Sequence, residues 1–108
     1  ENDVAGIDIN MGCPKEFSIK GKMGVALLED SNKACTILKT LVNNLSIPVS
    51  CKIRIFESAD ETLEVVKKLV NSGIQAIAIH GRTRNERPQH PVHPDIISHV
   101  AQNISIPV

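Results

Sequence analysis

Asp8-Ile-Asn-Met-Gly-Cys-Pro-Lys15 is the stretch that decides the fold. Hydrophobic residues alternate with Asp8 and Asn10, and a period of two predicts a strand with one buried face. The strand must end at Gly12-Cys-Pro14, because proline has no N–H to give to a sheet and glycine favours a turn. A single cysteine at a strand end is usually a small buried hydrophobe. Two further strands that end in polar residues favour a functional site here.

Three segments have the i, i+3, i+4 spacing of amphipathic helices. They run from Ser31 to Leu45, from the capping box Ser58-Ala-Asp-Glu61 to Gly73, and from Pro94 onward. Runs of β-branched residues lie between them, at 6–11, 49–55 and 74–79, and a fourth begins at Val108. Strands that alternate with helices predict an α/β fold with a parallel sheet.

A repeat and the parity of the strands refine this prediction. Ser46-Ile-Pro-Val49 recurs as Ser105-Ile-Pro-Val108, a spacing that fits two strand–helix units of roughly thirty residues. In each strand the residues that point to one side are large and branched, while those that point to the other side are small or polar. A doubly wound sheet needs apolar residues on both faces, whereas a (β/α)8 barrel admits polar residues near its C-terminal mouth. We therefore expect a TIM barrel, of which 108 residues are about half.

Composition limits the possible classes of function. The chain has zero formal net charge at neutral pH and 42% hydrophobic residues, which argues against disorder and gives no global attraction to nucleic acid. Its three cysteines form no C-x-x-C pair, so we expect a reducing, cytoplasmic or nuclear environment. No apolar run has membrane-spanning length. Both ends look cut, and we expect the chain to be part of a larger domain.

Polar side chains follow each complete strand. They are Asn10 and Cys13, Lys52 and Arg54, and His80 and Arg82. Because the carboxyl ends of parallel strands meet at one edge, we expect them to form one site. Glycoside hydrolysis is disfavoured, since it needs two carboxylates at the mouth.

The residues leave several chemistries open. Cys13 and His80 could form a thiolate–imidazole pair, and His90-x-x-His93 with Cys13 could bind zinc, although we expect no metal site. Lys52 suits an anionic cofactor such as a reduced flavin. A thiol near its ordinary pKa of about 8.5 can also act as a general acid.

Six of the twelve basic residues fall in two predicted loops after the first and third strands. They are Lys15, Lys20 and Lys22, followed by Arg82, Arg84 and Arg87. Both loops would rise from the active-site face, where RNA phosphates could approach. With two Phe and no Trp or Tyr, the chain offers little aromatic surface for base stacking.

Three motifs in this order resemble the flavin-dependent tRNA-dihydrouridine synthases: Asp8-Ile-Asn-Met-Gly-Cys-Pro14, Cys51-Lys-Ile-Arg54 and Ile79-His-Gly-Arg82. The segment Lys20-Gly-Lys-Met-Gly-Val-Ala-Leu-Leu28 is also similar. Asn85-Glu-Arg-Pro-Gln-His-Pro-Val92 resembles the eukaryotic cytosolic branch that modifies uridine 20 of the tRNA D-loop. The resemblance covers essentially the whole chain. It implies that residues 1–108 are the central part of a flavin-binding (β/α)8 catalytic domain, truncated at both ends, with roughly strands 4 to 6 and the start of strand 7.

The resemblance also implies roles for individual residues. Cys13 would protonate C5 of the uracil, while hydride passes from reduced FMN to C6 and NADPH recharges the flavin. Lys52 and His80 match flavin contacts, and Asn10 and Arg54 match positions that line the pocket. The remaining substrate-binding candidates, which would contact tRNA, are Lys20, Lys22, Arg82, Arg84 and Arg87.

Two alternatives remain from the sequence. The chain could be an inactive half-barrel with at most RNA or partner binding. It could instead come from a related flavin barrel that acts on a free pyrimidine, as a dihydroorotate dehydrogenase does. The sequence leaves the oligomeric state open.

Overall fold

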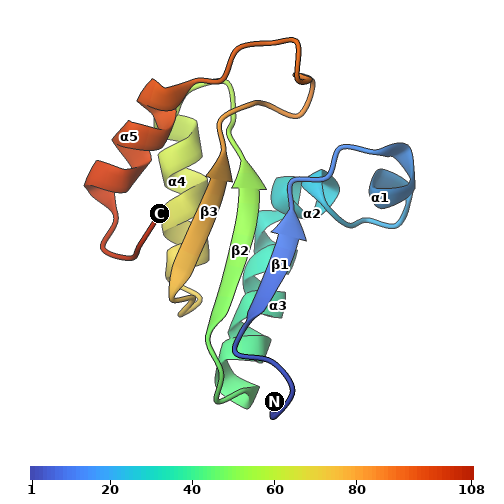
Figure 1. Cartoon of the computed structure of the whole chain (residues 1–108), viewed down its shortest axis with the longest axis vertical. Coiled ribbons are helices and arrows are strands. Elements are labelled where there is room, and N and C mark those ends of the chain that lie inside the picture. Colours follow the sequence, from blue (N-terminus) through green and yellow to red (C-terminus); the bar gives the residue numbers. More distant parts are fainter.

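The computed structural model describes all 108 residues as an α/β fold (Figure 1). Its sheet has three parallel strands in the order β1 (Ile7–Met11), β2 (Val49–Arg54) and β3 (Ala76–His80). Of the longer helices, α3 (Ser31–Asn44) and α4 (Ala59–Val70) lie behind the sheet in Figure 1, and α5 (Pro94–Asn103) packs beside α4 at the left. Two short helices, α1 (Glu16–Lys20) and α2 (Val25–Glu29), follow β1. The three strands form an open sheet.

The register of the strands confirms the predicted parity. Met11, Ile53 and Ile79 are aligned on the helix side, where Met11 and Ile53 are fully buried. On the other side Asn10 aligns with Lys52 and Ala78, and in the next row Arg54 aligns with His80. The three members of the first row are exposed. The sheet therefore presents one apolar face to its helices and one polar, open face.

The helix ends agree with the predictions to within a few residues. Asp30 caps α3 by accepting a hydrogen bond from the Lys33 N–H at 3.3 Å. The Ser58 hydroxyl caps α4 by accepting from the Glu61 N–H at 3.0 Å. Helix α4 ends at Val70, three residues before the predicted stop at Gly73. Helix α5 begins with proline, as predicted.

The Ser-Ile-Pro-Val repeat performs the same structural task twice. The carbonyl of Pro48 accepts a hydrogen bond from the Ile7 N–H at 2.9 Å, at the start of β1. The carbonyl of Pro107 accepts from the Ile77 N–H at 3.1 Å, at the start of β3. Each repeat thus sets a new segment beside the preceding strand. The strand predicted to begin at Val108 stays a prediction, because Val108 is the last residue of the sequence.

The predicted loop after β1 contains α1 and α2, which are only five residues long and carry no readable helical period. None of the helices has the length and apolar character needed to cross a membrane.

Replacing Ser58 by alanine is expected to lower the free energy of unfolding by about 1 kcal/mol, because the Glu61 N–H loses its cap. Chemical denaturation measures this change. Ser105→Ala is the matched control, since Ser105 is exposed and makes no side-chain hydrogen bond; it should change stability by less than about 0.5 kcal/mol. Equal effects of the two substitutions would contradict the assignment of Ser58 as the cap.

Candidate functional site

A pocket of about 180 Å³ lies at the C-terminal end of the strands. Its lining includes Asn10, Gly12, Cys13, Lys52, Arg54 and His80. These residues come from β1 and the turn after it, from β2 and from β3. The structure therefore brings the predicted strand-end residues together, apart from Arg82, which lies outside this lining.

The Asn10 side chain organises the turn that carries the cysteine. Its Oδ1 accepts hydrogen bonds from the backbone N–H groups of Gly12, at 2.9 Å, and Cys13, at 3.1 Å. This asparagine turn fixes the backbone of Cys13 relative to β1. The Asn10 amide nitrogen makes no hydrogen bond, so it is free to donate to a ligand. An asparagine two residues before a glycine at the end of a strand is the sequence signal that could have predicted this contact.

Cys13 differs in its environment from the other two cysteines. The hydroxyl of Ser18 donates a hydrogen bond to Cys13 Sγ at 3.1 Å. This bond, helped by the backbone N–H of Lys15 and by the charges of Lys15 and Arg54, lowers the pKa of the Cys13 thiol. Burial raises the pKa of Cys51 to about 12 and also raises that of Cys35. Cys13 is therefore the most acidic thiol of the chain.

The segment 14–24 leaves Cys13 and returns to it. The Cys13 carbonyl accepts a hydrogen bond from the Val25 N–H at 2.9 Å, where α2 begins. Gly24 precedes this contact with a φ of +57°, and a Cβ on it would lie 2.5 Å from the Cys13 carbonyl oxygen. Only glycine fits such a close approach in the left-handed region. Both ends of the segment are thus fixed to one residue.

Lys52 and His80 lie on the open face of the sheet. Lys52 is exposed between Asn10 and Ala78 and makes no ion pair or hydrogen bond within the chain. His80 Nε2 lies 3.1 Å from Nη1 of Arg82. Because a guanidinium only donates, Nε2 accepts and the ring proton sits on Nδ1. Burial, then the charges of nearby cations, lower the pKa of His80, so its imidazole is neutral at neutral pH.

Arg54 joins the ends of all three strands. Its side chain is only 8% exposed, and its Nε donates to the Gly12 carbonyl at 2.8 Å. Its Nη1 donates to the carbonyls of Thr83, at 2.8 Å, and Glu86, at 3.0 Å. Arg54 was predicted to contact substrate, and it does line the pocket. The structure adds a second task, because these N–H groups bind backbone rather than facing a ligand.

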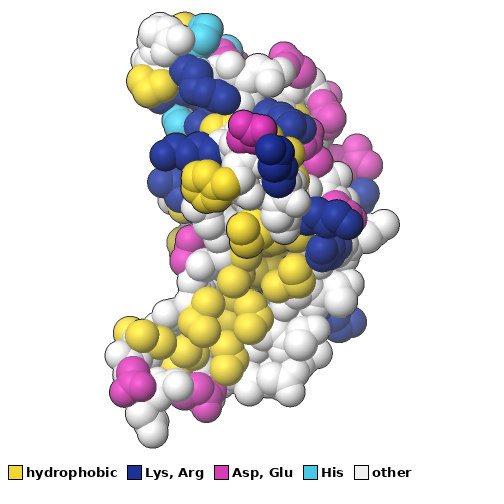
Figure 2. Space-filling model, turned by 90° about the vertical axis from the view of Figure 1, so that its right-hand side faces the viewer, with side chains coloured by type: hydrophobic (Ala, Val, Ile, Leu, Met, Phe, Trp, Pro, Cys, Tyr) yellow, Lys and Arg dark blue, Asp and Glu magenta, His cyan; other side chains and the backbone are white.

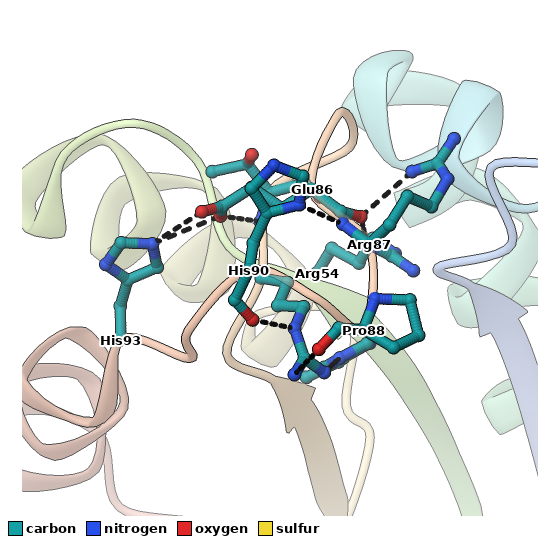
Figure 3. A network of polar contacts seen from close by, with 9 residues as sticks. Arg54, Glu86, Arg87, Pro88, His90 and His93 are labelled. Atoms are coloured by element: carbon teal, nitrogen blue, oxygen red, sulfur yellow. Dashed lines mark hydrogen bonds and ion pairs between the residues drawn. The ribbon is translucent and has the colours of Figure 1, made fainter.

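The loop after β3 is organised by its own polar side chains (Figure 3). The Glu86 carboxylate accepts from the Thr83 N–H at 2.8 Å and contacts His93 Nε2 at 2.9 Å. His90 Nδ1 accepts from the Arg87 N–H at 2.9 Å. Both His90 and His93 thus make hydrogen bonds that hold the conformation of this loop. No group of three His, Cys, Asp or Glu side chains has an arrangement that could hold a metal ion.

The six predicted RNA-contacting cations differ in how they are engaged. Lys20 belongs to α1 rather than to a loop, and pairs with Glu16 at 2.8 Å on an exposed surface. Arg84 pairs with Glu29. The guanidiniums of Arg82 and Arg87 donate to backbone carbonyls of their own loop, at His90 and Pro88 and at Arg84 and Glu86 respectively.

The side chains of Lys15 and Lys22 make no hydrogen bond or ion pair within the chain. Figure 2 shows Lys and Arg side chains gathered toward the upper part of this side of the molecule, above a hydrophobic area. Phe17 also lies in this segment and is 66% exposed. The sequence indicated little aromatic surface for stacking, and a count of aromatics could not reveal that one ring is exposed in the same segment as two lysines.

Comparison with known proteins places the chain among enzymes of one kind. The family model described as Dihydrouridine synthase (Dus) matches residues 1–108. A tRNA-dihydrouridine(20) synthase [NAD(P)+] of Schizosaccharomyces pombe is 41% identical over 103 residues, which cover 92% of this chain and 22% of the relative. The enzyme of the same name from Saccharomyces cerevisiae is 42% identical over 114 residues, covering 97% and 30%. The tRNA-dihydrouridine synthase B of Proteus vulgaris is 43% identical over 104 residues, covering 94% and 32%. The chain therefore spans between about a fifth and a third of the length of these relatives.

Replacing Arg54 by lysine is expected to lower the free energy of unfolding by about 3 kcal/mol and to speed amide hydrogen exchange in residues 83–87. Lysine cannot reach three carbonyls in the fork geometry of a guanidinium, and buried carbonyls lose a charged donor. Arg84→Lys is the matched control. Its ion pair with Glu29 is half-exposed, so the change should stay below about 1 kcal/mol.

The Glu86–His93 pair gives the loop a pH dependence. The hydrogen bond to Glu86 raises the pKa of His93 above 6.5, so its stabilising effect is complete below that pH and is lost as the pH rises through the folded value. The Thr83 N–H, then His93, lowers the pKa of Glu86 to about 2, so its effect is present above pH 4.5 and is lost toward pH 2. The pair stabilises the loop most between pH 4.5 and 6.5.

An NMR titration of the His93 ring tests this pair. Glu86→Gln should return the His93 midpoint toward 6.5, because the hydrogen-bonded carboxylate is gone. Glu57→Gln is the control, since Glu57 acts on His93 only through its charge and makes no hydrogen bond to the ring. A His93 midpoint that does not move in Glu86→Gln would rule the pair out as the cause.

Proposed function

This chain belongs to the dihydrouridine synthase family, so we propose that it is the catalytic segment of an FMN-dependent tRNA-dihydrouridine synthase. The intact protein would reduce a uridine of the tRNA D-loop to 5,6-dihydrouridine. The observation that carries this proposal is the pocket at the strand ends, where an acidic thiol, a free lysine and a neutral histidine share one lining. The names of the relatives support the substrate and the use of NAD(P)H.

The open sheet is consistent with a segment of a (β/α)8 barrel. All its polar open-face residues would then face the barrel interior near the C-terminal mouth. The free edges of β1 and β3 would pair with further strands of the intact domain. In this proposal residues 1–108 supply strands 4 to 6 and the approach to strand 7.

The residues of the pocket fit a flavin. Lys52 carries a positive charge that no carboxylate of the chain neutralises, which suits an anionic ring system. His80 offers an Nδ1–H, because Arg82 occupies Nε2, and this proton can be donated to a ring carbonyl. Ala78 beside Lys52 keeps the space over the sheet open. When bound, reduced FMN would supply hydride to C6 of the uracil, with NADPH as the source of its electrons.

Cys13 is the proposed general acid. Its S–H bond would break as a C–H bond forms at C5 of the uracil, and the electron pair would stay on sulfur as a thiolate. Ser18 and the cations Lys15 and Arg54 stabilise that thiolate. The Asn10 turn holds the Cys13 backbone in place while the proton moves. A thiol of lowered pKa gives up a proton more readily than Cys35 or Cys51 could.

The target base must leave the tRNA fold to reach this pocket. We propose that the segment beside Cys13 contacts the RNA, with Lys15 and Lys22 near phosphates and Phe17 available to stack on a base. Lys20, Arg82, Arg84 and Arg87 would reach phosphates only by sharing or giving up the contacts described above. Similarity to two enzymes named for position 20 favours uridine 20 as the target. The three unpaired cysteines favour a reducing, cytoplasmic location.

Two other readings are separated by simple assays. An inactive half-barrel would bind tRNA in a salt-sensitive manner without any need for flavin. A flavin barrel for free pyrimidines would reduce uracil or a related base in the absence of tRNA. The lysines and Phe17 beside Cys13 favour a polynucleotide substrate over a free base.

Cys13→Ala in the full-length protein tests the proposed function. Loss of the acid should reduce dihydrouridine formation by about a hundredfold or more, while flavin absorbance of the purified protein stays unchanged. Mass spectrometry of tRNA nucleosides measures the product. Cys35→Ala is the control, because Cys35 lies on α3 away from the pocket. Unchanged dihydrouridine in Cys13→Ala would exclude the acid role.

A further inference from the structure

We infer that Ser18 is a positioning residue for Cys13, whose buried hydroxyl orients the thiol and stabilises the thiolate left by proton transfer. This inference deepens the proposed function and rests on Cys13 acting as the acid. It starts from the one side-chain hydrogen bond that the Cys13 sulfur makes within the chain, from Ser18 Oγ to Sγ at 3.1 Å.

The Ser18 hydroxyl is held in place by its surroundings. Ser18 is only 5% exposed, although it lies in a short surface helix. Its N–H donates to the Lys15 carbonyl at 3.0 Å, and its carbonyl accepts from the Met23 N–H at 2.8 Å. The backbone on both sides is thus fixed, and the hydroxyl points inward at the sulfur. A buried hydroxyl that lost this partner would remain unsatisfied, which disfavours any other rotamer.

The direction of the hydrogen bond determines its chemical effect. Serine donates, so a lone pair of sulfur is occupied and the S–H proton must point elsewhere. Two charged side chains also act on the sulfur, Lys15 from the turn and Arg54 from β2. Lys52 and His80 line the same pocket. The Arg54 guanidinium donates its hydrogen bonds to carbonyls, so Ser18 is the side chain that hydrogen-bonds to the sulfur itself.

Ser18 gives and receives no proton in this step. The proton that reaches C5 comes from the Cys13 S–H bond, whose electron pair stays on sulfur. The Ser18 O–H remains intact and shortens its contact as sulfur becomes negative, because hydrogen bonds to charged acceptors are stronger. The serine therefore favours the product side of the proton transfer without itself touching the uracil.

Ser18→Ala in the full-length, flavin-loaded protein tests this inference. Ser72→Ala is the matched control, since Ser72 is also buried, at 7% exposed, and its hydroxyl bonds only to the Leu69 carbonyl of its own helix turn. Ser18→Thr is the conservative variant, because it keeps the hydroxyl. The first readout is the pH dependence of Cys13 alkylation by iodoacetamide without tRNA, resolved by peptide mass spectrometry. The second is kcat and KM for dihydrouridine formation.

Ser18→Ala should move the alkylation midpoint of Cys13 upward by about one pH unit or more, because the thiolate loses a hydrogen bond. The kcat should fall roughly three- to tenfold, with KM for tRNA changed less than about twofold, since a weaker acid slows proton transfer without weakening binding. Ser18→Thr should recover most of both effects. Ser72→Ala should leave both unchanged.

An alkylation midpoint in Ser18→Ala equal to that of the unmodified protein would overturn the inference. So would flavin loss in Ser18→Ala that Ser18→Thr does not recover, because Ser18 would then serve folding alone. The alkylation readout also separates the two proposals. A shifted midpoint in a protein that makes no dihydrouridine would refute the proposed function and, with it, the acid role on which this inference rests, whereas an unshifted midpoint in an active enzyme would refute the role of Ser18 alone.

Discussion

The buried guanidinium of Arg54 is the contact on which the rest of the site depends. The three strands end at nearly the same level, and each is followed by irregular backbone whose carbonyls need donors. Arg54 supplies those donors to the turn after β1 and to the loop after β3 from the end of β2 between them. A single charged fork thus fixes the separation of Cys13 from the histidine-containing loop. Removing it would leave the other lining residues present but no longer held in position.

Local surroundings, more than residue type, assign the chemistry of the site. The pKa values of the three cysteines shift in different directions because Cys13 contacts a hydroxyl and lies near cations, whereas burial, complete for Cys51 and partial for Cys35, raises the pKa of the other two. Burial and then the charges of Arg54, Arg82 and Lys52 lower the pKa of His80, and the charge of Arg54 also helps to lower the pKa of Cys13. Positive charge in the pocket therefore favours the ionised form of Cys13, which is an anion, and disfavours the ionised form of His80, which is a cation. This arrangement gives the pocket one proton donor and one neutral hydrogen-bond donor side by side.

Much of this architecture could be predicted from the sequence, because it depends on local periodicity. The parity of the strands, the long helices and the meeting of Cys13, Lys52 and His80 follow from alternation and from the geometry of parallel sheets. The short helices after β1 were missed, since five residues carry too little periodic signal. The task of Arg54 was missed for another reason. Its acceptors are backbone carbonyls about thirty to forty residues away, and a carbonyl leaves no mark in the sequence.

The close approach of Gly24 to Cys13 has a consequence for genetic variation. A missense change in the Gly24 codon adds a Cβ against the Cys13 carbonyl oxygen, in backbone that side chains rarely adopt. The variant would displace the thiol although every chemical group of the proposed active site is still encoded. An allele of this kind would appear in an enzyme assay as a loss of catalysis, and a survey that scored only the reactive residues would classify it as harmless.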